Sequence, residues 1–262
     1  MKAFRLTLAL TLALASLISC KSQYDLLLEG HDVDAKYAAA FDYFNNGKYQ
    51  KAAAMFESLA YITSGMSIDD TVQYYWGLSN YRFKDYVTAE SNLERFVTNY
   101  PRSPFAEDAN FLRIDCMFRS TLRYELDQTP TYKAMAQIST FMGDYPKSDK
   151  IEVCLKMLED LGARLDRKEY ENARLYYKME DYKAARVALN NVLKDDAENI
   201  YREDILYHIA MSSYKYADMS VQQKKKERFL QFVDDYLNFV GEYPESHYRT
   251  ELDALYRKVK DK

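Results

Sequence analysis

The chain has 262 residues, and only 7 glycines and 5 prolines interrupt its backbone, well below average usage. The formal net charge is -4 with 29% charged residues, which argues against a nucleic-acid binder with its usual basic face. There are 25 tyrosines, a residue whose ring packs while its hydroxyl stays wet. This balance favours thin layers of secondary structure with much shared surface over a spherical core.

Residues 1–19 are typical of a secretory signal peptide, with two cations before an apolar run too short to span a bilayer. The run ends in LISC (17–20), which resembles a lipobox, where cleavage precedes a cysteine that carries diacylglycerol. We expect Cys20 to be lipidated and to begin a linker over 20–32; the alternative is an ordinary signal peptide with a cysteine nearby. Three acyl chains would anchor the protein stably. The next residue is lysine, not aspartate, which by resemblance to lipoprotein sorting rules favours the outer membrane. The tail KSQYD (21–25) lacks the immediate acidic cluster that resembles a surface-export signal, which favours the periplasmic face.

Three segments of the chain, 37–59, 74–96 and 170–192, align without gaps. Each begins with tyrosine, has a small residue three positions on and an aromatic residue after that, and continues with a second tyrosine and an alanine. This pattern resembles the tetratricopeptide repeat, a helix–turn–helix unit of about 34 residues. The small residues, which let neighbouring helices approach, are Ala40, Gly77 and Ala173. We therefore predict a tetratricopeptide-repeat domain over 33–262.

The phrase Phe-x-x-x-Tyr-Pro-x-Ser occurs three times and marks the repeat boundaries. A residue before proline is disfavoured in the helical region, so each tyrosine should close a helix. The serine that follows is the expected N-cap of the next helix, and Pro104 suits a first helical position. The tyrosines are Tyr100, Tyr145 and Tyr243, and the serines are Ser103, Ser148 and Ser246.

Two further repeats are less regular. In 104–146 we expect an extended loop over 124–133 between the two helices, and in 201–244 a long second helix. The final segment, 245–262, reads as one amphipathic helix that caps the array. The sequence therefore predicts an all-α tetratricopeptide-repeat α-solenoid, with about five helix–turn–helix repeats plus a C-terminal capping helix.

Together, the lipobox, the repeats and the segment FVTNYPRSPFAEDA (96–109) resemble the BamD family, over nearly all of the mature chain. The family phrase YPxSxYAxDA is met except that Phe105 replaces the usual tyrosine. The matching residues are Tyr100, Pro101, Ser103, Ala106, Asp108 and Ala109. The segments LDQTPTYKA (126–134) and LYYKMEDYKAA (175–185) resemble the version of the family found in Bacteroidota.

The resemblance implies an outer membrane lipoprotein subunit of the β-barrel assembly machinery. Such a protein scaffolds the barrel protein BamA and other subunits, and receives unfolded outer membrane proteins for insertion. It also implies that the first helices of the repeats line a groove for an extended apolar and aromatic peptide. The groove-facing repeat positions are Tyr37, Phe41, Phe44, Tyr74, Leu78 and Tyr81; the alternative is that these residues pack between helices.

The corresponding positions of the fourth repeat are more basic and could meet an acidic partner; the alternative is a solvated helix face. They are Tyr170, Arg174 and Tyr177. Two interpretations are also open for three consecutive lysines, Lys224, Lys225 and Lys226. They could dock to BamA or to anionic headgroups, or they could simply be exposed to solvent.

An enzyme is not expected, and no metal or other cofactor is implied. His31, His208 and His247 lie on three different elements without ligand spacing. The acidic pairs at 69–70, 195–196 and 234–235 are interpreted as capping and solubility groups. Cys116 and Cys154 are either buried free thiols or a structural bridge.

Two alternatives from other classes remain. A SusD-type glycan-binding lipoprotein uses similar repeats but is about twice as long, with a sugar-binding lobe for which this chain has no room. A generic periplasmic repeat adaptor for the envelope machinery is the other.

Overall fold

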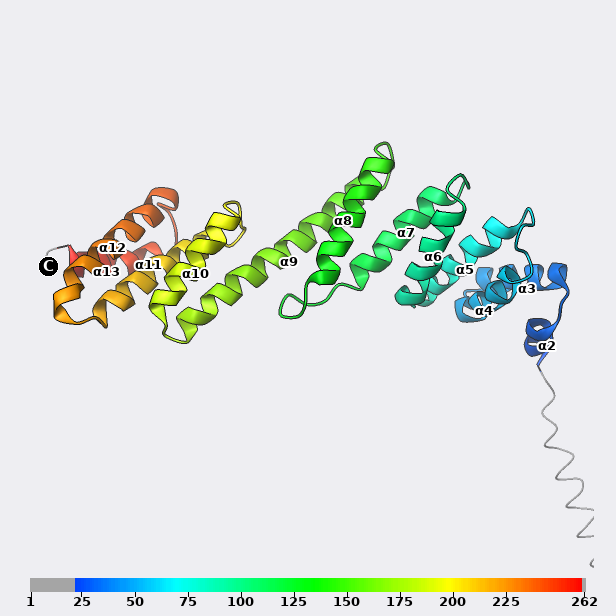
Figure 1. Cartoon of the computed structure of the whole chain (residues 1–262), viewed down its shortest axis with the longest axis horizontal. Helices are drawn as coiled ribbons and strands as arrows, with labels where there is room; N and C mark the ends of the chain where they lie inside the picture. Colours follow the sequence, from blue (N-terminus) through cyan, green and yellow to red (C-terminus); the bar gives the residue numbers. More distant parts are fainter. Residues whose placement is uncertain (1–21, 261–262) are drawn as a thin grey trace, which may run out of the picture. The chain divides into compact units, whose positions relative to one another are not determined.

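The computed structural model describes residues 22–260, so the predicted signal peptide and Cys20 lie outside the described residues. All regular elements in this range are α-helices (Figure 1). They are α2 (Gln23–Glu29), α3 (Val33–Asn45), α4 (Tyr49–Ala60), α5 (Asp69–Phe83), α6 (Tyr86–Asn99), α7 (Ala106–Arg119), α8 (Thr129–Asp144), α9 (Ile151–Lys178), α10 (Tyr182–Asp195), α11 (Arg202–Asp218), α12 (Gln222–Glu242) and α13 (Arg249–Val259). Five consecutive pairs, from α3–α4 to α11–α12, precede α13, which confirms the predicted repeat fold.

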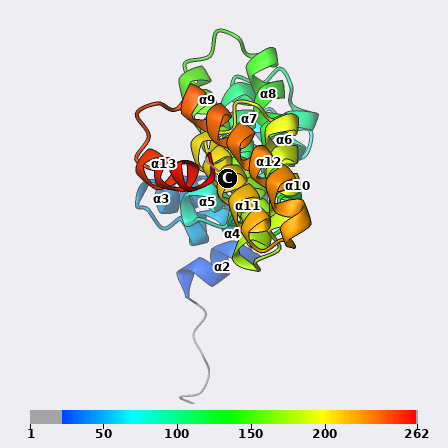
Figure 2. The same cartoon turned by 90° about the vertical axis from the view of Figure 1, so that its left-hand side faces the viewer.

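The described chain divides into two compact units. Unit 1 holds residues 22–120 with 143–145, and unit 2 holds 121–142 with 146–260. Within unit 1, each helix from α3 to α7 packs against the next one, and the same holds within unit 2 from α9 to α13. In Figure 2 the last three helices, α11, α12 and α13, are nearest the viewer. We call the first helix of each pair the A helix and the second the B helix; α13 occupies the next A position.

Small residues bring the two helices of a pair into contact, as predicted. Ala40 of α3 and Ala173 of α9 are buried. Gly77 of α5 faces α6 so closely that a Cβ atom there would lie 2.7 Å from Cδ2 of Leu93. Because non-bonded carbon atoms prefer separations of about 3.5–4.0 Å, α5 and α6 can pack this tightly only with glycine at position 77.

In three of the pairs, the turn between the two helices contains one residue with left-handed backbone geometry. The φ angle is 71° at Gly47, 69° at Lys84 and 62° at Glu180, three equivalent positions two residues before a tyrosine. Glycine adopts this conformation freely, whereas a residue with a Cβ atom is destabilised by roughly 1–2 kcal/mol. The next helix then starts on an aspartate cap, since Asp85 and Asp181 accept hydrogen bonds from the backbone N–H three residues on.

The Tyr-Pro-x-Ser phrase ends one pair and starts the next. Tyr100 and Tyr243 are the C-caps of α6 and α12, so the tyrosines close B helices as predicted. The serine prediction was wrong, because the next helix starts three residues after each serine. Each serine Oγ instead accepts a hydrogen bond from the backbone N–H two residues on, which closes a short turn. These distances are 3.3 Å at Ser103, 3.2 Å at Ser148 and 3.1 Å at Ser246. Pro104 lies within this turn and is not the first helical residue.

Several A helices have an aromatic N-cap residue that contacts the preceding A helix. In three places its ring stacks on a tyrosine of the preceding A helix. The pairs are Phe105 on Tyr74, Tyr201 on Tyr170 and Tyr248 on Tyr207, with ring centroids 4.5, 5.1 and 3.9 Å apart. The hydroxyl of Tyr248 also donates to Asp204 at 2.6 Å. The position of Asp204 in α11 corresponds to Thr71 in α5. Because α5 has no carboxylate there to accept a hydrogen bond from a tyrosine hydroxyl, phenylalanine suffices at position 105.

Two of the acidic pairs are structural acceptors, which corrects their interpretation as capping and solubility groups. Asp69 is only 4% exposed and accepts a 2.7 Å hydrogen bond from the hydroxyl of Tyr100. Asp70 accepts one of 2.8 Å from the serine of the same phrase. The end of α6 is thereby tied to the start of α5. In the pair at 234–235, the carboxylate of Asp235 accepts two hydrogen bonds from Arg186, at 2.7 and 2.9 Å.

The loop predicted over 124–133 is shorter and starts earlier. It covers 120–128, and α8 begins at Thr129 with Pro130 in its first turn. Proline is tolerated there because the first backbone N–H groups of a helix have no partner within it. Gln128 is buried and closes the loop by donating to the carbonyls of Arg123 and Leu126, at 2.8 and 3.0 Å.

Part of the predicted linker is helical. The short helix α2 begins with a capping box formed by Ser22 and Asp25. It contacts α3 and α4, and Nζ of Lys36, on α3, donates to the carbonyl of Leu28 at 2.9 Å. Residues 23–29 therefore extend the folded part of the chain toward position 20.

The stacked pair Phe105–Tyr74 supplies a stability test. Phe105→Ala should lower the free energy of unfolding by about 2 kcal/mol, less than for a fully buried phenylalanine because the ring is half-buried. Phe105→Tyr should change it little. Urea unfolding followed by circular dichroism measures both. The control is Phe83→Ala, since Phe83 is 47% exposed in the same unit and should matter by less than about 0.5 kcal/mol. Equal losses at both positions would contradict the role assigned to the stack.

Candidate functional site

A row of aromatic rings runs along the A helices of unit 1, with Tyr75 of α5 at its centre. Its ring centroid lies 4.6 Å from that of Phe41 and 5.2 Å from that of Phe44, both on α3. It also contacts Tyr74 at 5.4 Å and Phe105, before α7, at 6.2 Å. We call these five residues the unit-1 row; through them the junctions α3–α5 and α5–α7 share one aromatic cluster.

The six residues predicted to face a peptide differ in how open they are. Tyr74 is only 7% exposed, while the others are partly buried. Tyr37 contacts Phe41 at 4.9 Å and so extends the unit-1 row. Sequence reasoning missed Tyr75, although the doubled tyrosine was a signal. Successive helical residues point about 100° apart, so the alignment register that selected Tyr74 excluded its neighbour.

Tyr81 and Leu78 lie further along α5. The hydroxyl of Tyr81 donates to Asp115 of α7 at 2.6 Å, and Nε of Arg119 lies 2.5 Å from the same carboxylate oxygen. Burial and this hydrogen bond raise the pKa of Tyr81 to about 12, so the phenol stays protonated. Leu78 packs beside it in the same cluster. This end of α5 is therefore fastened to α7 by a polar contact.

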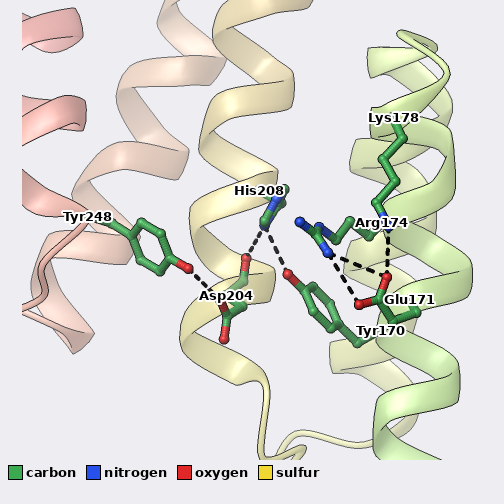
Figure 3. Close-up of polar contacts among 7 residues, drawn as sticks. All are labelled: Tyr170, Glu171, Arg174, Lys178, Asp204, His208 and Tyr248. Atoms are coloured by element: carbon green, nitrogen blue, oxygen red, sulfur yellow. Dashed lines mark hydrogen bonds and ion pairs between the residues drawn. The ribbon is translucent and has the colours of Figure 1, made fainter.

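A second row lies along α9, α11 and α13 of unit 2, and Figure 3 shows its polar contacts. The predicted partner residues gather there: the rings of Tyr170 and Tyr177 lie 5.9 and 5.1 Å from His208 of α11. Tyr170 is buried, whereas Tyr177 is half-buried and the side chain of Arg174 is 34% exposed. The structure thus brings all three together at the junction of two A helices.

Arg174 is already paired within the chain. Its Nη1 atom donates to Glu171 at 3.2 Å, and Nζ of Lys178 reaches the same carboxylate at 3.0 Å (Figure 3). Burial opposes ionisation of Glu171, but the two cations outweigh it and lower the pKa of this carboxyl group. The Nε atom of Arg174 is buried and lacks a hydrogen-bond partner among the described residues. The exposed third of the Arg174 side chain is the part that a partner could reach.

His208 is a buried, neutral histidine at the centre of the second row. Its Nδ1 atom lies 2.8 Å from the carbonyl oxygen of Asp204 and 3.3 Å from the hydroxyl oxygen of Tyr170. A carbonyl only accepts hydrogen bonds, so we assign the ring proton to Nδ1. Burial lowers the pKa of His208, and the nearby Arg174 acts in the same direction.

At its end, the row connects α11 and α13 through the hydrogen bonds of two tyrosine hydroxyls. Tyr207 of α11 donates to Glu251 at 2.9 Å, and Tyr248 donates back to Asp204 at 2.6 Å. Burial and the hydrogen bond to Asp204 raise the pKa of Tyr248 to about 12. We call Tyr170, Tyr177, Tyr207, His208 and Tyr248 the unit-2 row. It combines aromatic surface with hydroxyl groups held by carboxylates.

Both cysteines of the described chain are free and buried, so the structural bridge considered above does not form. Burial raises the pKa of the Cys116 thiol to about 12, and it raises that of Cys154 too. Thiols of this kind are poor nucleophiles.

Among residues 22–260, no group of three histidine, cysteine or acidic side chains could hold a metal ion. The two rows are suited to contact a polypeptide through rings and hydrogen bonds.

Helix pairs that pack in succession define a helical repeat protein. A family model for YfiO, described as outer membrane lipoprotein, matches residues 30–228. The chain belongs to this family, which is the family of the outer membrane assembly factor BamD, as the sequence resemblance predicted.

Two relatives extend the match over most of the chain. The outer membrane protein assembly factor BamD of Caulobacter vibrioides is 22% identical over 258 residues, which cover 97% of this chain and 80% of the relative. A protein of Aquifex aeolicus, provisionally named as the same factor, is 26% identical over 229 residues, or 87% of this chain and 73% of the relative. Of the helices described here, none has both the length and the apolar character needed to cross a membrane.

The lowered pKa of His208 predicts a pH-dependent stability. Below pH 6.5 the unfolded chain binds a proton that the folded chain resists, so stability falls as the pH drops through this value toward the folded pKa. Each tenfold difference between the two acid constants corresponds to about 1.4 kcal/mol. Urea unfolding of the wild type and of His208→Gln, measured from neutral pH down to about pH 5, should show the smaller pH dependence in the variant. His247→Gln, on an exposed residue, is the control; parallel curves for wild type and His208→Gln would refute the assignment.

Proposed function

We propose that this chain is the lipoprotein subunit of a β-barrel assembly machinery. In this role it scaffolds a BamA-like barrel protein, together with other subunits, and receives unfolded outer membrane proteins for insertion. The observation that carries the proposal is the family match over residues 30–228, which extends from before α3 into α12. The relatives bear the name of an outer membrane protein assembly factor. The protein then acts by binding alone, without catalysis or a cofactor.

The unit-1 row is proposed as the site for unfolded substrates. Tyr37, Phe41 and Tyr75 are partly exposed rings on two adjoining A helices. Aromatic rings supply a large contact area to apolar side chains, and tyrosine hydroxyls add hydrogen bonds for an extended backbone. We assign Tyr74 to packing, because it is buried under Phe105, and Leu78 to the edge of the site.

The unit-2 row is proposed as the contact for an acidic segment of the barrel protein. A partner carboxylate would replace Glu171 on Arg174, with Lys178 beside it. The 34% exposure of the Arg174 side chain supports this, since a carboxylate can accept two parallel hydrogen bonds from a guanidinium. Tyr177 would supply the adjoining apolar surface.

The anchor is proposed on Cys20, which lies outside the described residues. The description of the family as outer membrane lipoproteins supports it. Because α2 begins at Gln23, the lipid would lie within about 10 Å of the first helix and would hold the repeats close to the inner leaflet. Mass spectrometry of the mature N-terminal peptide should find Cys20 acylated; an unmodified cysteine would reject the anchor.

Co-purification tests the assembly role. Solubilisation of the membrane in mild detergent should recover a BamA-like barrel protein with this chain. Arg174→Gln should reduce that recovery by roughly tenfold, as the loss of about 1.4 kcal/mol would do. Arg102→Gln, on an exposed residue of unit 1, should not. Recovery of a transporter, or of cell-wall enzymes alone, would rule out the proposed function.

Photocrosslinking tests the substrate site. A photoreactive residue at position 37 or 78 should crosslink to a peptide with the C-terminal strand sequence of an outer membrane protein. The same residue at position 87 is the matched control, since Val87 is 75% exposed on the B helix α6 and away from the row. Tyr37→Ala should weaken the crosslink at position 78 while helicity stays unchanged. Equal crosslinking at 37, 78 and 87 would discard the site.

A further inference from the structure

The last helix pair differs from the others in the length of its B helix. Helix α12 has 21 residues, about 31 Å, whereas α13, which packs against it, has 11 residues, about 16 Å. The other B helices have 12 to 16 residues. A helix half as long can cover only part of α12, and the N-terminal half of α12 borders a groove.

A groove of about 640 Å³ occupies this place, between the first half of α12 and the end of α13. Its floor is apolar, with Phe229 and Val259 buried and Val233 partly buried. Leu230 stands at its edge and is 59% exposed, and Leu237, seven residues on, is 54% exposed. Residues seven apart lie on the same side of a helix, so Leu230 and Leu237 share one side of α12, with the exposed carboxylate of Asp234 between them.

Cations rim this groove. Lys225 and Lys226 lie at its α12 side and Lys260 at the end of α13. The one carboxylate in the lining, Asp218, lies 3.9 Å from Nζ of Lys225, at the outer limit for an ion pair. Two of the three lysines singled out in the sequence therefore border an apolar surface, which distinguishes them from an ordinary solvated face.

We propose that this groove, the α12 groove, binds an acidic amphipathic helix from a partner protein. Such a helix would lay apolar residues spaced three, four and seven apart over Leu230 and Val233, which is the helix-in-groove mode of recognition. Its carboxylates would meet the lysine rim, where charge complementarity selects the partner and speeds association. The bound helix would occupy the position that the next B helix has in a longer array.

The α12 groove shares no residue with either aromatic row. Its binding can therefore be tested with a peptide alone, without any component of an assembly machinery. The probe is a fluorescent helical peptide of about 14 residues, roughly four turns, with leucines in the stated spacing and glutamates on both flanks. Its matched partner has lysine for every glutamate. Binding to the mature chain, carrying Cys20→Ser so that no detergent is needed, is followed by fluorescence anisotropy at low salt.

The acidic peptide should bind roughly tenfold more tightly than the lysine peptide, and added salt should weaken it. Lys225→Gln combined with Lys226→Gln, and separately Leu230→Ser, should each weaken it by roughly tenfold without changing the melting temperature. Lys194→Gln and Leu155→Ser are the matched controls, because both residues are exposed on other helices of unit 2. Equal binding of the two peptides, or wild-type binding by the α12 variants, would overturn the proposal. Vesicles with phosphatidylglycerol are the last arm: lysine-dependent binding to them without binding to the peptide would show a membrane contact instead.

Discussion

At three junctions, consecutive A helices are held together by the same contact, the stacking of an N-cap ring on a tyrosine of the preceding A helix. A single helix pair has apolar surface on both sides and cannot bury it alone, so it needs its neighbours in the array. The stack covers part of this surface and adds roughly 0.5–1.5 kcal/mol beyond area burial. Because the ring sits on the N-cap residue, directly before the next helix, it also fixes where that helix starts. The N-cap residues Phe105 and Tyr248 thus set the distance of their helices from the preceding A helix.

Stacking explains why the chain uses tyrosine so often. The ring can pack under the next helix while the hydroxyl reaches a carboxylate on another element, as in Tyr81 with Asp115 and Tyr100 with Asp69. Burial and the carboxylates keep these phenols protonated and therefore able to donate. These hydrogen bonds occupy acidic residues that would otherwise add to the surface charge. The aromatic surface that remains open is consequently neutral and capable of hydrogen bonding, which suits a polypeptide ligand.

Features encoded over a few residues could be predicted from the sequence. The tyrosine of each Tyr-Pro-x-Ser phrase closes a B helix, and the small residues at Gly77 and Ala173 mark the close approach of paired helices. The fifth repeat, predicted to be less regular, keeps the same spacing with Tyr207, Ala210 and Tyr214, and a long B helix follows it. The serine position was wrong for a local reason, since the hydroxyl turn and a helix cap share the same residue preference.

Other features depend on contacts between residues far apart in sequence. Whether Tyr74 or Tyr75 is buried depends on where Phe105 lies, which no local pattern states. The burial of His208 likewise depends on Tyr170 and Tyr177 of another helix. The scattered histidines excluded metal spacing, but they gave no sign that one of them would be held neutral at the junction of two A helices.

The charges of the two proposed protein contacts imply different energetics. On the unit-2 row, Arg174 and Lys178 are already paired with Glu171, so a partner carboxylate would exchange one ion pair for another. Such an exchange is close to balanced once desolvation is included, and affinity there must come mainly from burying the adjoining rings. On the α12 groove the lysines have a single distant carboxylate, so attraction acts over a longer range and mainly raises the rate of encounter. One contact is therefore suited to slow, lasting attachment, and the other to rapid capture of an acidic segment.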